Sequence, residues 1–160
     1  CMMTPLEEAT ILQALKLKGD EQVLEIGTGS GFFTALLSHS AAYVTSVDCY
    51  PEFTEQAAKK LNIHGRGNVT LLTGDGSDGW LDKAPYDVVV YTGALPKIND
   101  IQRLQVLPGG KLFSITGNAP VMRGELHLLN HDKVWQTEFL FDTCLPLLMN
   151  NRVSMKPFVF

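Results

Sequence analysis

The sequence predicts a single α/β domain built on a mostly parallel β-sheet. A short run from Val23 to Ile26, apolar except for Glu25, leads through glycines at alternate positions directly into an amphipathic helix, as a strand–turn–helix unit does. Strand-like and helix-like segments then alternate along the chain in the order βαβαβ and βαβ. The nearly continuous apolar run Tyr86–Tyr91 is typical of a strand covered on both faces. Right-handed crossovers between parallel strands place helices on both faces of such a sheet.

The first half of the chain carries clear helix signals. Thr4 can cap a helix, Pro5 suits its first position and Glu7 completes a capping box, and we expect this helix to run to Lys18-Gly19-Asp20. The elements that follow are a strand at 23–26, a helix from 32 to about 40, a strand at 43–47 ending at Asp48, a helix at 52–61 after Pro51, and a strand at 69–73.

The second half predicts further strands and one helix. After the strand at 86–91 we expect a helix around 97–106, a turn at Pro108-Gly109-Gly110 and a strand at 111–116. The segments 125–129 and 134–140 are predicted to form an antiparallel hairpin joined by 130–133. No element is predicted for residues 146–160.

Composition limits the class of protein. The 160 residues are 45% hydrophobic and carry a formal charge of −4, with Lys and Arg scattered, which disfavours backbone-driven nucleic-acid binding. The apolar runs are too short to cross a bilayer, and no signal-peptide pattern is present, so we expect no membrane partner. The spacing of Cys1, Cys49 and Cys144 fits a reducing, cytoplasmic location and offers no zinc site. Because the chain starts at Cys1, we expect residues 1–160 to be a domain that lacks an N-terminal segment.

The glycine turn predicts a nucleoside ligand with a cationic part. Its pattern is Glu25-x-Gly27-x-Gly29-x-Gly31, whereas a dinucleotide fingerprint would have its third glycine at Phe32. Asp48 follows the first glycine by roughly 20 residues, where an acid usually binds ribose hydroxyls. Asp75, between Gly74 and Gly76, is placed to accept from an adenine amino group. Acids at the ends of adjacent strands favour a sulfonium- and ammonium-bearing nucleoside, and S-adenosyl-L-methionine fits that description.

A wider set of motifs resembles one family. The run Glu25–Gly31 is similar to the cofactor motif of Rossmann-like methyltransferases. Together with further motifs, the chain resembles protein-L-isoaspartate O-methyltransferases over about Pro5 to Thr116. Those further motifs are Gly74-Asp75-Gly76, Gly79-Trp80, Ala84-Pro85-Tyr86-Asp87 and Leu107-Pro108-Gly109-Gly110-Lys111-Leu112. The resemblance implies a three-layer αβα fold with a seven-stranded, mostly parallel sheet and a C-terminal antiparallel hairpin. It also implies methyl transfer to the side-chain carboxyl of isoaspartyl residues in damaged protein.

The resemblance also implies roles for individual residues. The methionine part of the cofactor would be lined by Gly27, Thr28, Gly29 and Gly31, with Ser30 in the same motif. Glu25 would support its amino group and Asp48 its ribose, while Asp75 and Gly76 would hold the adenine. The family's serine, two positions before the residue equivalent to Pro5, aligns with Met3, which has no donor hydrogen. Thr4 is adjacent and carries a hydroxyl.

Methyl transfer to a carboxylate needs positioning rather than a base, because an aspartyl side chain with a pKa near ~3.9 is already ionised at neutral pH. No metal site and no catalytic histidine are therefore expected. Thr4 and Thr92 are the candidate positioning residues, with further donors at Gly93, Ala94 and 116–118.

Two other functions remain open. One is a methyltransferase with another acceptor, either a small molecule or RNA; Tyr91-Thr92-Gly93-Ala94 lacks the Asn/Asp-Pro-Pro-aromatic motif of many exocyclic-amine methyltransferases. The other is a cofactor-binding module impaired in turnover, because Met3 replaces the serine. The sequence leaves the oligomeric state undetermined.

Overall fold

The protein folds around one seven-stranded sheet, in a computed structural model that describes residues 2–148. The strand order is β3-β2-β1-β4-β5-β6-β7, parallel from β3 to β5 and antiparallel from β5 to β7. The strands are β1 (Gln22–Ile26), β2 (Tyr43–Asp48), β3 (Val69–Thr73), β4 (Tyr86–Leu95), β5 (Val106–Asn118), β6 (Val121–Leu129) and β7 (Trp135–Thr143). The predicted mostly parallel sheet with a C-terminal hairpin is therefore confirmed.

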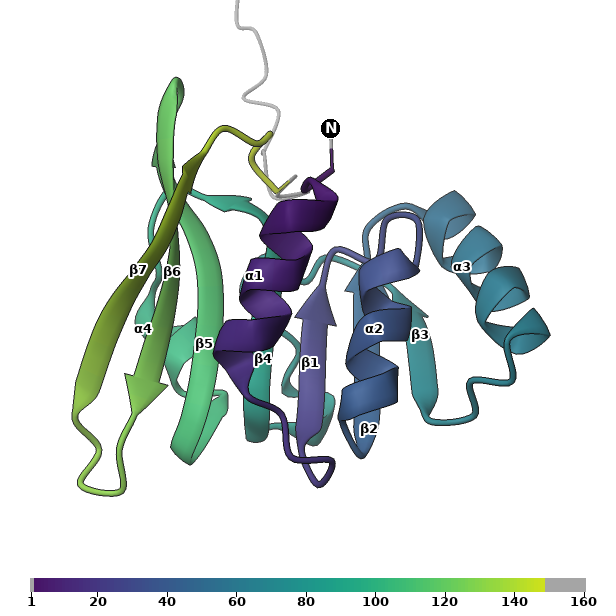
Figure 1. The fold of residues 1–160 in the computed structure, drawn as a ribbon, viewed down its shortest axis with the longest axis horizontal. Helices are drawn as coiled ribbons and strands as arrows, with labels where there is room; N and C mark the ends of the chain where they lie inside the picture. Colours follow the sequence, from purple (N-terminus) through teal and green to yellow (C-terminus); the bar gives the residue numbers. More distant parts are fainter. Residues whose placement is uncertain (1, 149–160) are drawn as a thin grey trace, which may run out of the picture.

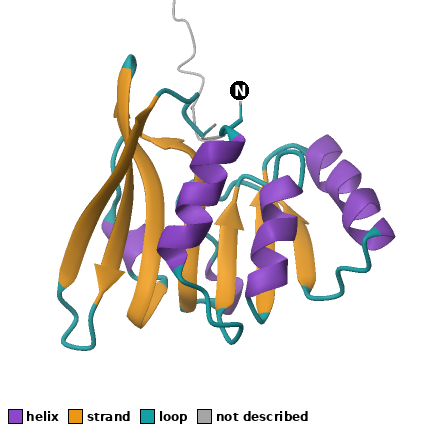
Figure 2. Ribbon diagram, viewed as in Figure 1, coloured by secondary structure: helices purple, strands orange, loops and turns teal. Residues whose placement is uncertain are grey.

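Helices lie on both faces of this sheet (Figures 1 and 2). In the view of Figure 1, α1 and α2 lie in front of the sheet, α4 lies behind it, and α3 lies beside β3 at the end of the sheet opposite β7. The helices are α1 (Pro5–Leu15), α2 (Phe32–Ser40), α3 (Pro51–Ile63) and α4 (Asp100–Arg103), with a 3₁₀ turn η1 (Leu81–Lys83). None of the helices within residues 2–148 is long and apolar enough to span a membrane.

Helix α1 begins as predicted but ends early. The Thr4 hydroxyl and the Glu7 carboxylate form the expected reciprocal capping box. The helix ends at Leu15, because Lys16 adopts a left-handed conformation with φ 49°. The Lys111 ammonium donates to the Leu15 carbonyl oxygen and so satisfies one of the backbone acceptors left free at the helix end.

The predicted helix and turn between β4 and β5 are wrong in extent. The helix is a single turn, Asp100–Arg103, which begins after its N-cap residue Asn99. After the helix, the buried side-chain amide of Gln105 donates to the backbone carbonyls of Asp78 and Ile101. The segment Pro108–Gly110 lies within β5 rather than between elements, at an irregularity where the pairing with β4 shifts between Val88 and Tyr86. This local bulge keeps the chain in the sheet despite its turn-like sequence.

Each face of the sheet has its own apolar core. Side chains such as Ile11, Leu37 and Phe113 pack under α1 and α2, while Leu24, Val89 and Leu112 pack on the opposite face. Beyond β7 the chain returns to the sheet, where Leu147 forms a parallel bridge with Ala94. The carboxyl ends of β1, β2 and β4 thus meet the start of α1 and residues 146–148 at one end of the sheet. Residues 149–160, the rest of the segment with no predicted element, lie outside the described residues.

Candidate active site

The glycine turn between β1 and α2 requires glycine for two different reasons. Gly27 has φ +106° and Gly31 has φ +78°, values that side-chain-bearing residues rarely adopt. A Cβ added to Gly31 would also lie 2.8 Å from the Cβ of Ala57, where α3 packs against the turn. The Gly27 N–H donates to the Val47 carbonyl at 2.7 Å, which anchors the turn to β2. The turn is therefore a tight, fixed loop at the carboxyl end of β1, where ligands bind in open α/β sheets.

Asp48 fixes the middle of this turn. Its side chain is 8% exposed, and its Oδ2 accepts a hydrogen bond of 2.9 Å from the Gly29 N–H. Its Oδ1 accepts another of 3.0 Å from the Tyr50 N–H. Such charge-assisted bonds to backbone amides are stronger than neutral ones. Asp48 therefore couples the ends of β1 and β2 while it remains on the wall of the adjacent cavity.

Glu25 is completely buried next to the turn. Its Oε2 accepts hydrogen bonds from the hydroxyls of Thr34, at 2.5 Å, and Ser46, at 2.6 Å. Its Oε1 is buried and has no hydrogen-bond partner among the described residues. Burial raises the pKa of Glu25 to about 7, against the two hydroxyls that lower it, and the charges of Glu8 and Asp48 raise it further. The carboxyl group thus holds a proton readily and retains an unused oxygen.

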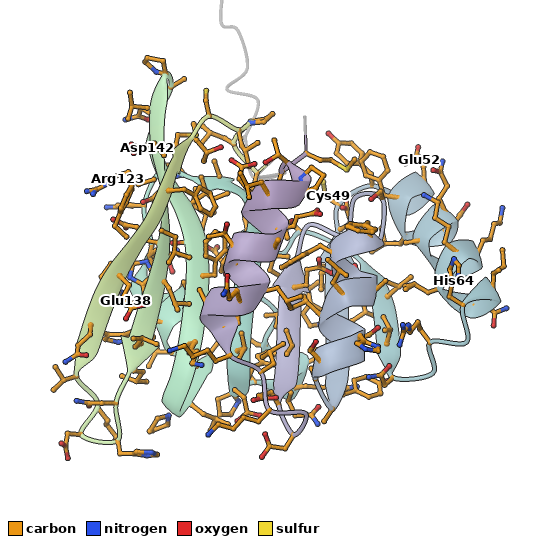
Figure 3. The ribbon with its side chains drawn as sticks, viewed as in Figure 1. Cys49, Glu52, His64, Arg123, Glu138 and Asp142 are labelled. Atoms are coloured by element: carbon orange, nitrogen blue, oxygen red, sulfur yellow. The ribbon has the colours of Figure 1, made fainter. Side chains whose placement is uncertain are left out.

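A cavity of about 430 Å³ opens over the glycine turn. Figure 3 labels one of its lining residues, Cys49, at the upper end of the sheet. Of the sequence-predicted cofactor residues, six line it: Gly27, Thr28, Gly29, Ser30, Asp48 and Gly76. Three others, Glu25, Gly31 and Asp75, are not on its wall. The structure thus brings most of the predicted set together around one space, with Glu25 and Gly31 acting from behind it.

Asp75 is directed to a neighbouring cavity. Its Oδ1 accepts a hydrogen bond of 3.0 Å from the Ser77 N–H, and it follows the end of β3 by two residues. Asp75 lines a second cavity of about 360 Å³, to which Ser77 also contributes. Because Ser77 lines both cavities, Asp75 lies beside the first one rather than remote from it.

The two predicted positioning residues behave differently. Thr92 lies on the cavity wall, where the pairing of β4 with β5 shifts between Val90 and Ala94. Its hydroxyl donates to the carbonyls of Ile26, at 3.0 Å, and Gly27, at 2.6 Å. The Thr4 hydroxyl is exposed and is engaged by Glu7, away from the cavity wall. The local irregularity of β4 thus turns Thr92 toward the glycine turn, while capping keeps Thr4 outside.

Met3 occupies the cavity wall in place of a hydroxyl. Its side chain is 8% exposed and belongs to the core cluster beneath α1. A thioether sulfur has no hydrogen to donate. The cavity wall is therefore apolar at Met3, the position that aligns with the family's serine.

Sequence reasoning missed several other wall residues. Glu8 on α1, the aromatic residues Tyr50 and Phe53, and Pro146–Leu148 all contribute to the cavity. Tyr50 and Phe53 contact each other edge to face, with ring centroids 5.6 Å apart. Their spacing across the start of α3 is a signal that could have found the pair, whereas nothing local in 146–148 predicts its return to β4.

The charges on the cavity wall favour a cationic ligand. Its ionisable carboxylates are Glu8 and Asp48, and no lysine, arginine or histidine contributes to it among residues 2–148. The same described part of the chain contains no group of His, Cys, Asp or Glu that could hold a metal ion. The size and the acidic wall of the cavity suit a nucleoside-sized ligand with positive charge.

Comparisons with known proteins identify relatives of this chain. The model of the protein-L-isoaspartate(D-aspartate) O-methyltransferase family matches residues 2–144. A protein-L-isoaspartate O-methyltransferase of Myxococcus xanthus is 43% identical over 113 residues, which cover 71% of this chain and 53% of that protein. The chain spans about half the length of the curated relatives that it matches.

Solved structures share the fold. A protein-L-isoaspartate O-methyltransferase superposes with a TM-score of 0.81 at 24% identity, covering 92% of this chain and 48% of that one. A Plasmodium falciparum protein described as a putative member of the same family, in complex with S-adenosyl-L-homocysteine, gives a TM-score of 0.73 at 12% identity, covering 94% of this chain and 76% of that one.

Proposed function

The chain belongs to the protein-L-isoaspartate O-methyltransferase family, and on that premise we propose that it binds S-adenosyl-L-methionine and methylates isoaspartyl carboxylates in damaged protein. We propose further that residues 1–160 act as a single methyltransferase domain. The observation that carries the proposal is the glycine turn, fixed by the Asp48 carboxylate, on the wall of a cavity whose ionisable side chains are acids.

The residues at the turn fit this cofactor. Backbone of Gly27–Ser30 lines the space, and the unpartnered Oε1 of Glu25 lies behind it. We assign Gly27, Thr28, Gly29 and Ser30 to its methionine part, and Asp48 to the ribose. Gly76 on the cavity wall and Asp75 beside it are assigned to the adenine. Bound there, S-adenosyl-L-methionine supplies an electrophilic methyl group on a positively charged sulfur.

The chain's own task is to position the acceptor. The acceptor carboxylate is ionised at neutral pH, so no side chain has to remove a proton. Holding two reactants in line can lower a barrier by about 7–11 kcal/mol. Thr92 and Gly93 of β4, with Pro146–Leu148 directly beside them, form the wall that would orient the acceptor and exclude water.

A second candidate is a cofactor-binding module with weak turnover. The observation that favours it is the buried Met3 thioether at the position of the family's serine. The Thr92 hydroxyl does not replace that donor, because its hydrogen is shared between the Ile26 and Gly27 carbonyls. On this account the cofactor binds and methyl ester forms slowly.

One experiment separates these functions. The protein is titrated calorimetrically with S-adenosyl-L-homocysteine and then assayed for base-labile methyl ester formation on an isoaspartyl peptide with S-adenosyl-L-methionine. Binding with ester formation supports the proposal. Binding without ester supports the second candidate, and absence of binding contradicts both.

A further inference from the structure

Glu8 is a cavity-wall carboxylate that neither the sequence reasoning nor the assignments above use. It lies in the first turns of α1, is half-buried, and shares the wall with Met3 and Phe33. Burial raises the pKa of Glu8, and the charge of Glu7 adds to this effect. A carboxylate that faces a cavity without a cationic side chain beside it costs free energy unless a ligand supplies the positive charge.

Glu25, which is buried behind the glycine turn, has an unused carboxyl oxygen. Its Oε2 is held by Thr34 of α2 and Ser46 of β2. Its Oε1 is buried and has no hydrogen-bond partner among the described residues. The charge of Glu8 also raises the pKa of Glu25. Buried polar atoms without a partner are rare in folded proteins, and a ligand that donates a hydrogen bond is one explanation for such an atom.

The surrounding charges do not neutralise this pair. The other charges that act on the two carboxyl groups are those of Glu7 on α1 and Asp48 at the end of β2, both acidic. The Lys60 ammonium binds the outer side of the turn, where it donates to the Ser30 carbonyl at 3.1 Å. An anionic acceptor carboxylate would be repelled here, whereas an ammonium group could donate to both acids.

We propose that Glu8 is a further cofactor-binding residue, whose carboxylate receives, together with Glu25, the ammonium group of the amino-acid part of S-adenosyl-L-methionine. The inference rests on the proposed function, because it assumes that this cofactor occupies the cavity. It assigns the wall formed by α1 to the cofactor rather than to the acceptor. It also gives the cofactor's amino group a contact outside the glycine turn.

The test compares two probes that differ in the amino-acid part. S-adenosyl-L-homocysteine carries the ammonium group, whereas 5′-methylthioadenosine lacks the amino-acid part. Calorimetric affinities for both are measured with the unmodified protein, Glu8→Gln and Glu8→Asp. Glu138→Gln on β7 removes the same charge from an exposed site far from Cys49 in Figure 3 and serves as the control. Thermal unfolding of each variant confirms that it is folded.

The expected result is a selective loss. Glu8→Gln should weaken the binding of S-adenosyl-L-homocysteine roughly tenfold or more, as loss of a charged hydrogen bond does. The affinity for 5′-methylthioadenosine should not change. Glu8→Asp should retain part of the affinity, and Glu138→Gln should bind both probes normally. Equal losses for both probes, or no loss for either, would overturn the role of Glu8. Failure of the unmodified protein to bind S-adenosyl-L-homocysteine would instead refute the proposed function.

Discussion

The Asp48 carboxylate accepts a hydrogen bond of 2.9 Å from the Gly29 N–H, which ties the end of β2 to the middle of the glycine turn. The same side chain also caps the Tyr50 N–H, at 3.0 Å. One buried acid therefore shapes the turn and borders the cavity. This double role makes Asp48 the residue whose replacement should affect both ligand binding and local stability.

Replacing Asp48 with Ala should weaken S-adenosyl-L-homocysteine binding at least tenfold. The free energy of unfolding should fall by about 1–3 kcal/mol, because two backbone donors lose their partner. Asp48→Asn retains one acceptor oxygen, so its affinity and its free energy of unfolding should lie between those of Asp48→Ala and the unmodified protein. Calorimetry and urea denaturation measure the two effects; unchanged affinity in Asp48→Ala would contradict the proposed ribose contact.

The packing of the glycine turn against α3 can be isolated by three glycine substitutions. Gly31→Ala places a methyl group against Ala57 at φ +78°, whereas Gly65→Ala has φ +65° and open space. Gly67→Ala has neither problem. In urea denaturation, we expect the free energy of unfolding to fall by roughly 2–4 kcal/mol in Gly31→Ala and by roughly 1–2 kcal/mol in Gly65→Ala. We expect about 0 kcal/mol of change in Gly67→Ala. If Gly31→Ala were no more destabilising than Gly65→Ala, the close approach of α3 would be wrong.

Burial of Glu25 should make stability depend on pH. Its pKa is raised from 4.5 to about 7 in the folded protein, so the folded state binds the proton more tightly than the unfolded chain. The contribution of Glu25 is therefore fully present below about pH 4.5 and declines as pH rises through about 7, by on the order of 3 kcal/mol.

Glu25→Gln tests this dependence, because it keeps an oxygen for Thr34 and Ser46 but cannot ionise. Unfolding free energies measured at several pH values between about 5 and 8 should fall less steeply with rising pH in Glu25→Gln than in the unmodified protein. Parallel pH profiles would show that Glu25 does not titrate in this range.

The turn and its acid were predictable because their signals are local. The alternate glycines from Gly27 and the strand-ending Asp48 have few structural alternatives, and the structure places Gly27, Gly29 and Asp48 on the cavity wall with Gly31 behind it. Pro108–Gly110 misled the prediction, since a bulge paired with β4 absorbs residues that usually make a turn. Glu8 and Pro146–Leu148 reach the cavity only through tertiary packing, which no local pattern encodes.

Restoring a hydroxyl at Met3 should increase methyl transfer. Met3→Ser supplies a donor at the cavity wall, and we expect kcat/KM for an isoaspartyl peptide to rise about tenfold, the worth of one charged hydrogen bond. The loss of a buried side chain should cost about 2–5 kcal/mol of stability. Met2→Ser, at a neighbouring exposed wall position, is the matched control and should give no gain. Equal rates for both variants would remove Met3 as the cause of weak turnover.

The most direct test of the central claim is the rate of methyl ester formation on two peptides of identical sequence, one with an isoaspartyl and one with an ordinary aspartyl residue. With S-adenosyl-L-methionine present, the account predicts ester formation on the isoaspartyl peptide that exceeds that on the aspartyl peptide by at least an order of magnitude. Equal rates on the two peptides, or ester on neither while S-adenosyl-L-homocysteine binds, would contradict it.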